Sequence, residues 1–377
     1  MRWIAILLAA IVVGVLVSTG VGLAASSSGS QQQTSSNKEG PGVSVMTRNV
    51  YHGVNAELAD AAAAQSPQEF FVKATAVFNG YHQRNFPERA ALLAAEIEET
   101  QPDVVGLQEA VMVRTDTPAD GPATPAEQVS LDYLQILLDK LQARGLNYTA
   151  VVQSINWDIE VPTSQNFDLR HTDRVVTLIR TDRKSGLKVL GTNSGHFQRN
   201  CTLPTAAVGG ITILRGWTSV DLSIQGKEVR FINTHLDGDC SDFDPTIQFD
   251  QAQEIIQGPV QEAKDRNLPV ILLGDLNSKA DGSGTPTYAE LIKPEVGFAD
   301  AWVEAGRGSG YTCCQDADLL NPDPSLEDRR DFVLFLSGAL QATDAEVVGA
   351  NPADRTPSGL WPSDHAGVVA DLRLLSE

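Results

Sequence analysis

The clearest pattern along the chain is a short hydrophobic run that ends in polar residues. Residues 270–273 read Val-Ile-Leu-Leu between Pro269 and Gly274, and Asp275 and Asn277 follow directly. A run of this length between turn-forming residues is typical of a strand that is buried on both faces. Side chains two positions apart in a strand point to the same side. Asp275 and Asn277 are therefore predicted to lie together at the carboxyl end of this strand.

Comparable runs recur along the chain, and each has a polar residue at one end. Strands are predicted over residues 43–47, 104–107, 175–179, 218–224, 228–233, 330–335 and 368–372. Ligands of α/β proteins usually bind at the carboxyl ends of the strands. Asn49, Glu109 and His235 follow the carboxyl ends of their strands, whereas Asp331 begins its strand and Asp364 and His365 precede theirs.

Helical periodicity separates several of these runs. Apolar residues recur at helical spacing over residues 90–97, after a proline at position 87 that suits a first turn, and again over residues 131–141 and 246–257. Residues 111–126 are rich in Pro, Thr, Asp and Gly, and they are predicted to form a long loop. The alternation of strands and helices, with no internal repeat, predicts a single α/β (α+β) domain of two packed sheets flanked by helices.

The first 25 residues have the composition of a targeting segment. Arg2 is followed by an apolar stretch over residues 3–17 and then by small residues up to Ala25. A cleaved signal peptide over residues 1–25 and a secreted protein are predicted. An uncleaved membrane anchor is the alternative, because about 20 apolar residues can span a bilayer. Residues 26–42 are rich in Ser, Gln and Gly and are predicted to be a disordered linker, which leaves residues 43–377 for the folded domain.

Charge and cysteine content limit the functions that fit. The net charge of −20 at pH 7 argues against a protein that binds polyanions through broad basic patches. A phosphate ester would then need a metal ion or a local arginine cluster for positive charge. Four cysteines in an exported chain suit disulfides. Cys201 and Cys240 could pair, although the sequence does not fix the connectivity, and a bridge between the adjacent Cys313 and Cys314 is expected to be strained.

The polar strand-end residues form a series of short motifs. In chain order they are Asn49, Gln108-Glu109, Asn233-Thr234-His235, Gly274-Asp275-Leu276-Asn277, Arg330-Asp331 and Ser363-Asp364-His365. This series resembles the endonuclease/exonuclease/phosphatase superfamily, the deoxyribonuclease-I-like metal-dependent phosphoesterases. The resemblance covers nearly all of the folded domain. It implies a four-layer α/β sandwich with two packed mixed β-sheets flanked by helices, and metal-dependent hydrolysis of a phosphoester.

The resemblance also implies a metal site. Glu109 matches the principal metal ligand, Asn49 an orienting or secondary ligand, and Asp364 a ligand or a carboxylate behind the ligands. Mg²⁺ is the implied cofactor, with Mn²⁺ or Ca²⁺ as alternatives, because these ions prefer hard oxygen ligands.

The remaining motif residues match catalytic groups of the same family. Asp275 matches the residue that activates the attacking water, and Asn277 the one that orients the water and the phosphate. His365 matches the histidine that contacts the scissile phosphate, Asp331 its carboxylate partner, and His235 a histidine near the leaving group. Either Asp275 or His365 can be the formal base at this stage. A sixth residue, Arg174, could hold a phosphate or form a salt bridge.

The sequence predicts the reaction more sharply than the substrate. The prediction is an exported, metal-dependent endonuclease or phosphodiesterase, a monomer without a protein partner, that acts on nucleic acid. The alternative is a sphingomyelinase-like or inositol-phosphate-type phosphodiesterase or phosphatase for lipid head groups or small phosphate esters. A lipid-acting version is expected to show an exposed apolar hairpin with aromatic tips, and none is evident in the sequence. An inactive binding module is the remote alternative.

Overall fold

The central strands bury residues on both of their faces, so each sheet must be covered on both sides. The structure is a computed structural model that describes residues 40–182, 186–240 and 244–375. The predicted segment 1–25 and most of the predicted linker 26–42 lie outside these residues. In the part of the chain that is described, no helix is long and apolar enough to cross a membrane.

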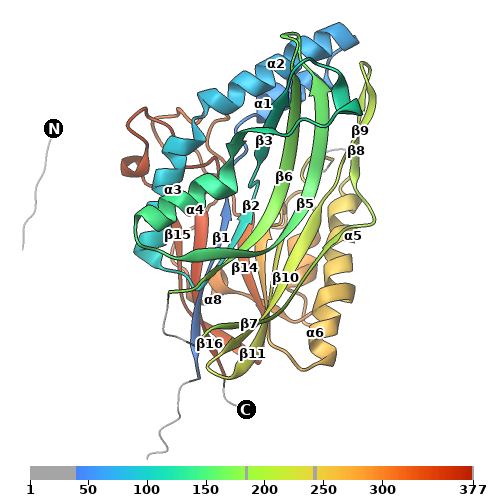
Figure 1. Cartoon of the computed structure of the whole chain (residues 1–377). Coiled ribbons are helices and arrows are strands. Elements are labelled where there is room, and N and C mark those ends of the chain that lie inside the picture. The colour runs from blue at the N-terminus through green and yellow to red at the C-terminus, as the bar shows by residue number, and fades with distance from the viewer. Residues whose placement is uncertain (1–39, 183–185, 241–243, 376–377) are drawn as a thin grey trace, which may run out of the picture. The chain divides into compact units, whose positions relative to one another are not determined.

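Eight of the described strands form the first sheet: β1 (Gly42–Asn49), β2 (Val104–Gln108), β3 (Met112–Asp116), β4 (Gln128–Asp132), β5 (Tyr148–Pro162), β6 (Asp168–Arg180), β15 (Leu340–Val348) and β16 (Gly367–Leu374). Their order is β15-β16-β1-β2-β6-β3-β4, and β5 pairs with β6. The β1–β2 pair is parallel, and the other pairs of this sheet are antiparallel. The long strands β5 and β6 extend toward α2 in Figure 1.

Six of the described strands form the second sheet: β7 (Lys188–His196), β10 (Gly216–Ile224), β11 (Lys227–His235), β12 (Val270–Asp275), β13 (Phe298–Asp300) and β14 (Asp331–Leu336). Their order is β13-β14-β12-β11-β10-β7, and β11 and β12 are parallel. A separate hairpin consists of β8 (Cys201–Thr205) and β9 (Gly209–Ile213).

Helices cover the outer faces of the two sheets. Against the first sheet lie α1 (Asn55–Ala62), α2 (Pro67–Gln83), α3 (Phe86–Thr100) and α4 (Tyr133–Ala143). Against the second sheet lie α5 (Thr246–Ile255), a π-helical turn (Ile256–Val260), α6 (Gln261–Asp265) and α7 (Thr287–Leu291). Figure 1 shows these two groups on opposite sides of the strands. The remaining helical segments are α8 (Ala301–Ala305) and the short turns Gly121–Ala123 and Pro352–Asp354.

Three large apolar clusters fill the spaces between these layers. Neighbouring residues of one strand belong to different clusters: Val104 packs between the sheets, whereas Val105 packs against the helices of the first sheet. Ile271 and Leu272 divide in the same way between the sheet interface and the helices of the second sheet. These clusters confirm the predicted α/β (α+β) class, a four-layer sandwich with two packed mixed β-sheets flanked by helices.

Residues 111–126 are not a continuous loop, contrary to the prediction. Strand β3 lies within this segment and pairs with β6 opposite His171 and Thr172. Its hydrogen-bond partners come from a distant part of the chain, and this tertiary pairing outweighs the polar local composition.

Helix α2 and strand β5 are not among the elements that the sequence predicts. The side chain of Ser66 caps α2 by accepting a hydrogen bond from the backbone N–H of Glu69.

All four cysteines are paired. Cys201 at the start of β8 is bonded to Cys240 in the segment after β11, with their Cα atoms 5.6 Å apart. This bridge ties the hairpin to the second sheet. The adjacent Cys313 and Cys314 are bonded to each other.

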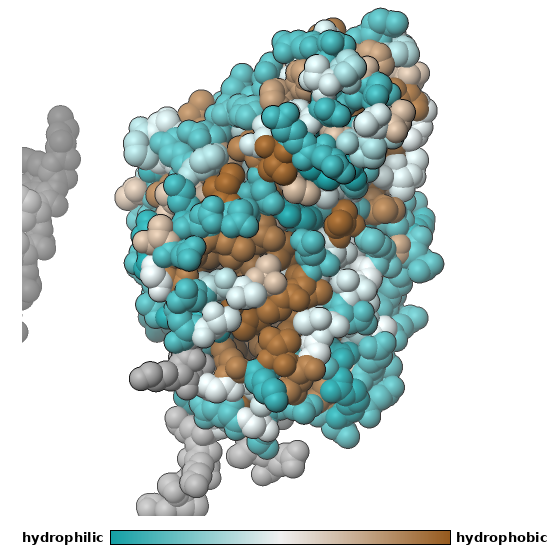
Figure 2. All heavy atoms as spheres, viewed as in Figure 1, coloured by the Kyte–Doolittle hydropathy of each residue, from teal (hydrophilic) through white to brown (hydrophobic). Residues whose placement is uncertain are grey.

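The surface of the domain is mixed in polarity. Figure 2 shows hydrophobic residues gathered in a central band on one face, with polar residues around it. Apolar atoms contribute much of any folded surface, so the band alone does not identify a binding site.

Candidate functional site

The pairing of three strands in the second sheet brings distant residues into one row. His235 at the end of β11 pairs with Asp275 at the end of β12, and Asp275 pairs with Asp331 at the start of β14. In the first sheet, Asn49 at the end of β1 pairs with Gln108 at the end of β2. Both rows lie at the same end of the sandwich, where a cavity of about 650 Å³ opens.

A hydrogen bond between the sheets fixes these rows relative to each other. Gln108 Nε2 donates to Asn233 Oδ1 at 2.7 Å, and Asn233 Nδ2 donates to the carbonyl oxygens of Leu107 and Val176. An ideal Cβ on Gly106 would lie 2.7 Å from the Asn233 side chain, so a larger residue at position 106 would push the sheets apart. Gln108 and Asn233 thus link the two sheets next to the site.

Asn49 connects two carboxylates of the site. Its Nδ2 donates to Glu109 Oε1 at 2.9 Å and to Asp275 Oδ2 at 3.1 Å, and its Oδ1 accepts from the backbone N–H of Tyr51. The second oxygen of Glu109 accepts from the backbone N–H of His52 at 2.7 Å. Glu109 has a φ of 58°, a conformation that costs energy for a residue with a side chain and is typical of functional sites.

Two buried acids face the cavity with different proton affinities. Burial alone would raise the pKa of Glu109, but the nearby His52 and His235 hold it below its usual value. Burial raises the pKa of Asp364 to about 7, where the charge of His365 opposes the shift and the charge of Glu109 adds to it. At neutral pH Glu109 is therefore a carboxylate, whereas Asp364 is close to its titration midpoint.

These donors fit a magnesium ion. Glu109 and Asp364 offer carboxylate oxygens, which Mg²⁺ prefers, and Mg²⁺ commonly takes one or two carboxylates plus water and substrate. Asn49 turns its Nδ2 toward Glu109 and its Oδ1 toward the Tyr51 N–H, which fits the predicted orienting role rather than that of a secondary ligand. Among the described residues, the group of acidic and histidine atoms within 4.8 Å of one another in this cavity consists of Asp275, Asp331 and His365. Glu109 and Asp364 line the same cavity outside this group.

His365 lies between two carboxylates. Its Nδ1 is 2.8 Å from Asp331 Oδ2, and its Nε2 is 3.7 Å from Asp275 Oδ2. Burial alone would lower the pKa of His365, but the charges of Asp331 and Asp275 raise it well above its usual value. The pKa of Asp275 is lowered: burial opposes the shift, and the charge of His365 together with the hydrogen bonds from Asn277 and Asn49 outweighs it. This arrangement favours an imidazolium beside a carboxylate.

His235 is held in the opposite protonation state. Its Nδ1 is 2.8 Å from a guanidinium nitrogen of Arg215, which can only donate a hydrogen bond. Burial and the charge of Arg215 lower the pKa of His235. The Nε2 atom of the neutral ring lies 3.4 Å from Asp275 Oδ2. Arg215 in turn pairs with Asp239 at 2.7 Å.

Asn277 completes the row beside Asp275. Its backbone N–H donates to Asp275 Oδ1 at 2.8 Å, and its side-chain amide lies 3.1 Å from His235 Nε2. An ideal Cβ on Gly238 would lie 2.7 Å from the Asn277 side chain, so the glycine leaves room for this amide. The structure thus brings together every predicted catalytic and metal-binding residue.

Arg174 does not line the cavity. It is buried on β6, where its Nε donates to the carbonyl oxygen of Ala110 at 2.7 Å and its guanidinium pairs with Asp132. These contacts do not support the predicted phosphate-binding role of Arg174. In the structure Arg174 instead forms the predicted alternative, a salt bridge, with Asp132.

Three residues of the site are not among the predicted ones. Arg215 and Arg330 line the cavity, where they pair with Asp239 and Asp328, and His52 lies with its Nε2 3.6 Å from Glu109. Arg330 is adjacent to the predicted site residue Asp331 in the sequence, so the sequence could have predicted that it belongs to the site. His52 and Arg215 have no such signal, because their roles come from contacts across the fold.

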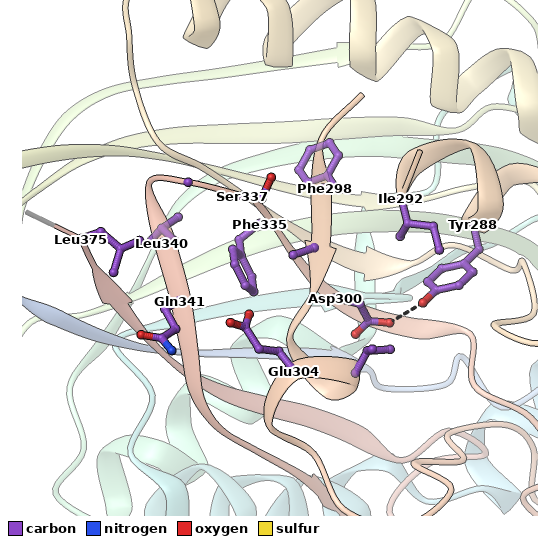
Figure 3. A pocket seen from close by; sticks show the side chains of 13 residues that line it. Tyr288, Ile292, Phe298, Asp300, Glu304, Phe335, Ser337, Leu340, Gln341 and Leu375 are labelled. Carbon is purple, nitrogen blue, oxygen red and sulfur yellow. Dashed lines mark hydrogen bonds between the residues drawn. The ribbon is translucent and has the colours of Figure 1, made fainter. Parts of the chain in front are cut away.

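A second cavity, of about 750 Å³, lies at the opposite end of the second sheet. Figure 3 shows its lining, in which the hydroxyl of Tyr288 points to the carboxylate of Asp300. Asp300 accepts hydrogen bonds from Tyr288 at 2.8 Å and from Arg329. Its charge is therefore used within the fold, and we assign the chemistry to the first cavity.

Comparison with known proteins agrees with this geometry. No curated protein matches the chain. Among solved structures, a mannosyl-6-phosphatase of Bacteroides thetaiotaomicron VPI-5482 has 15% identity and a TM-score of 0.54, covering 88% of this chain and 99% of that one. The human Nocturnin catalytic domain with bound sulfate has 16% identity and a TM-score of 0.52, covering 89% and 95%. TDP2 of D. rerio complexed with a single strand DNA product has 17% identity and a TM-score of 0.51, covering 88% and 98%.

These structures share the fold of this domain. A match to a family description extends from residue 49 to residue 365, which are Asn49 and His365 of the site. The chain belongs to the Endonuclease/Exonuclease/phosphatase family.

Proposed function

We propose that this phosphoester hydrolase is exported, depends on a divalent metal ion, and cleaves its substrate with a water molecule in the cavity of about 650 Å³. The observation that carries the proposal is the convergence of Glu109, of Asp275 with Asn277, and of His365 from three separate segments onto one buried site. A buried group of this kind with shifted pKa values is characteristic of active sites.

Glu109 and Asp364 would hold the metal ion, preferably Mg²⁺, and Asn49 would orient Glu109. When bound, the ion supplies positive charge to the phosphoryl oxygens. Glu109 and Asp364 both line the cavity of about 650 Å³, which can also admit the substrate phosphate. The amide of Asn49 ties Glu109 to Asp275, so the metal side and the water side of the site keep a fixed spacing.

Asp275 is the group best suited to accept a proton from the attacking water. Its pKa is lowered, so it is a carboxylate at neutral pH, and Asn277 and Asn49 hold it in place. His365 is not suited to be the base, because its raised pKa keeps it protonated. Its charged ring can donate from Nε2 to a phosphoryl oxygen while Asp331 holds Nδ1. This division of roles supports Asp275 as the base and His365 as the phosphate contact.

Export rests on two features. Residues 1–25 have the pattern of a signal peptide. The Cys201–Cys240 bridge suits an oxidising compartment. An uncleaved anchor over the same residues would export the domain equally.

Two substrate classes fit this chemistry. Nucleic acid is the substrate that the sequence predicts, and a solved neighbour, TDP2, carries a single strand DNA product. Esters of lipid head groups or small molecules are the alternative, and a mannosyl-6-phosphatase shares the fold. A nucleic-acid substrate has to approach a chain of net charge −20, so its phosphates would depend on the metal ion, Arg215 and Arg330 for positive charge.

The proposal is tested with the full chain in a panel of plasmid DNA, RNA, sphingomyelin, inositol phosphates and a chromogenic phosphodiester, with Mg²⁺ or with EDTA. We expect turnover that requires the metal and that falls at least 100-fold in Glu109→Gln. Glu228→Gln, on the exposed surface, is the matched control and is expected to match the wild type. Turnover that persists in EDTA, or in Glu109→Gln at saturating Mg²⁺, would show that the metal site is wrong.

A further inference from the structure

The cavity that contains the catalytic residues does not end at them. It continues into a region with apolar walls, formed by α1, α2, β5, β6 and the β8–β9 hairpin. We call this region the apolar chamber and define it by Phe70, Val77, Ile159, Leu169, Leu203 and Ile211, all of which line the same cavity as Glu109 and Asp275.

The strand pair β5–β6 forms one wall, and its character changes along its length. Side chains alternate between the faces of a strand, and on the cavity side three cross-strand pairs follow one another: Trp157 with Asp173, Ile159 with His171, and Val161 with Leu169. The wall therefore passes from a carboxylate near the catalytic end to aliphatic residues at the far end. Four residues of extended chain span roughly 13 Å.

The other face of the same strand pair is polar. Asp158 and Arg170, which alternate with the cavity-facing residues, form an ion pair there. Glu160 lies 3.9 Å from the same arginine. The apolar character is thus confined to the face that lines the cavity.

Helices α1 and α2 form the second wall. Phe70, Ala74 and Val77 recur at i, i+4 and i+7 on α2 and line the cavity together. Ala61 and Ala62 at the end of α1 line it as well. Alanines at these positions leave space that larger residues would fill.

The β8–β9 hairpin covers the chamber. Leu203 and Ile211 are directly opposite each other in the hairpin, are half-buried, and line the cavity. The Cys201–Cys240 bridge fixes the base of the hairpin. Its tip carries Val208, which is 46% exposed. A hairpin that is apolar both inside and at its tip is suited to contact with an aliphatic molecule.

An aromatic neck joins the chamber to the catalytic end. The ring of His52, whose backbone N–H binds Glu109, lies 6.1 Å from the ring of His171, and that ring lies 4.8 Å from the ring of Trp157. Burial and the charge of His52 lower the pKa of His171 to about 3, so its ring is neutral at physiological pH. The neck is therefore compatible with an apolar substituent passing through it.

We propose that the substrate is a phosphoester with an aliphatic chain, whose phosphate lies at Glu109, Asp275 and His365 and whose chain occupies the apolar chamber. This inference rests on the proposed function and selects its substrate class. A nucleic acid is charged along its whole backbone, so it would leave the chamber unfilled. Binding sites for single strands instead combine aromatic stacking surfaces with a basic groove, whereas five of the six residues that define this chamber are aliphatic.

The test uses the full chain with Mg²⁺ and p-nitrophenyl alkyl phosphodiesters that carry methyl, butyl, octyl or dodecyl chains, below their micelle concentrations. We expect kcat/KM to rise about fourfold for each methylene that enters the chamber, as burial of apolar surface predicts, and then to level off. The same protein is assayed on phosphatidylcholine vesicles. Cleavage in vesicles identifies a bilayer lipid as the source of the chain, and cleavage of dispersed esters alone identifies a free amphiphile.

Two variants test the place of binding. Ala62→Phe fills the chamber and Leu203→Asn makes its cover polar, so each is expected to lower the octyl-to-methyl ratio of kcat/KM at least tenfold. Val303→Ser is the control, because Val303 is 71% exposed on α8 and does not line this cavity. Thermal unfolding of each variant checks that it is folded.

The outcomes separate the two proposals. Equal kcat/KM for all chain lengths in the wild type overturns the aliphatic substrate and leaves the hydrolase in place. A steep chain-length dependence that both chamber variants retain places the chain elsewhere and also overturns the inference. If no ester is cleaved with any divalent metal, the proposed function fails and the inference fails with it.

Discussion

The most informative single change is Asp331→Asn. Asp331 is fully buried, and its Oδ2 lies 2.8 Å from Nδ1 of the nearly buried His365. An amide carries no charge, so it cannot keep the imidazole protonated as a carboxylate does. The variant is expected to lower the pKa of His365 and to weaken its contact with the phosphate in the transition state.

The size of the effect follows from burial. Hydrogen bonds to charged groups contribute about 1.5–3 kcal/mol, and breaking a buried ion pair costs about 3–5 kcal/mol. If roughly 2–4 kcal/mol of this is felt in the transition state, kcat falls roughly 30- to 1,000-fold. The stability effect has a defined sign. Because the folded pKa of His365 is raised, its contribution is present at acidic pH and is lost as pH rises through that pKa. The loss of stability in the variant is therefore largest below about pH 6.5.

Initial rates on a chromogenic phosphodiester measure the fall in kcat. NMR titration of labelled histidine measures the pKa of His365. Asp300→Asn is the matched control. Asp300 is also buried and bonded to an arginine, but it lies on the edge strand β13 and does not line the catalytic cavity. It should cost stability and leave kcat within about threefold of the wild type. If Asp331→Asn keeps near-wild-type kcat and an unchanged His365 titration, the proposed coupling does not exist.

Three further predictions concern groups outside the metal site. His171 has a pKa of about 3, so the folded protein should lose up to roughly 5 kcal/mol as pH falls from about 6.5 toward 3. Urea unfolding at pH 7 and pH 4 should therefore show a smaller difference for His171→Gln than for the wild type. Arg215→Met removes the charge that lowers the pKa of His235, so NMR should find that pKa higher in the variant. The double change Cys201→Ser and Cys240→Ser opens a loop with a sequence separation of 39 and should lower the free energy of unfolding by about 4 kcal/mol. An unchanged denaturant midpoint would show that the Cys201–Cys240 bridge does not contribute to the free energy of unfolding.

The elements that the sequence predicts best are the strands buried on both faces. Residues 270–273 and 104–107 must be apolar at every position, because one face packs against the other sheet and one against helices. Segments with mixed composition are predicted less well. Strand β3 lies in a Pro- and Asp-containing segment that reads as a loop, and only its pairing with β6 makes it a strand.

The site likewise has residues that the sequence predicts and contacts that it does not. The sequence alone determined which residues stand at strand ends, and therefore that Asn49, Glu109, Asp275 and His365 are candidates for one site. It did not determine the partner of Arg174, which is adjacent to a predicted strand but pairs with Asp132.

Only the tertiary structure decided the surroundings of these candidates. Arg215 sets the protonation of His235 across two strands, His52 binds Glu109 from a loop, and the apolar chamber is assembled from two helices, two strands and a hairpin. The physical reason is that local sequence patterns encode burial along one element. A cavity and the charges that face it depend on which distant elements pack together.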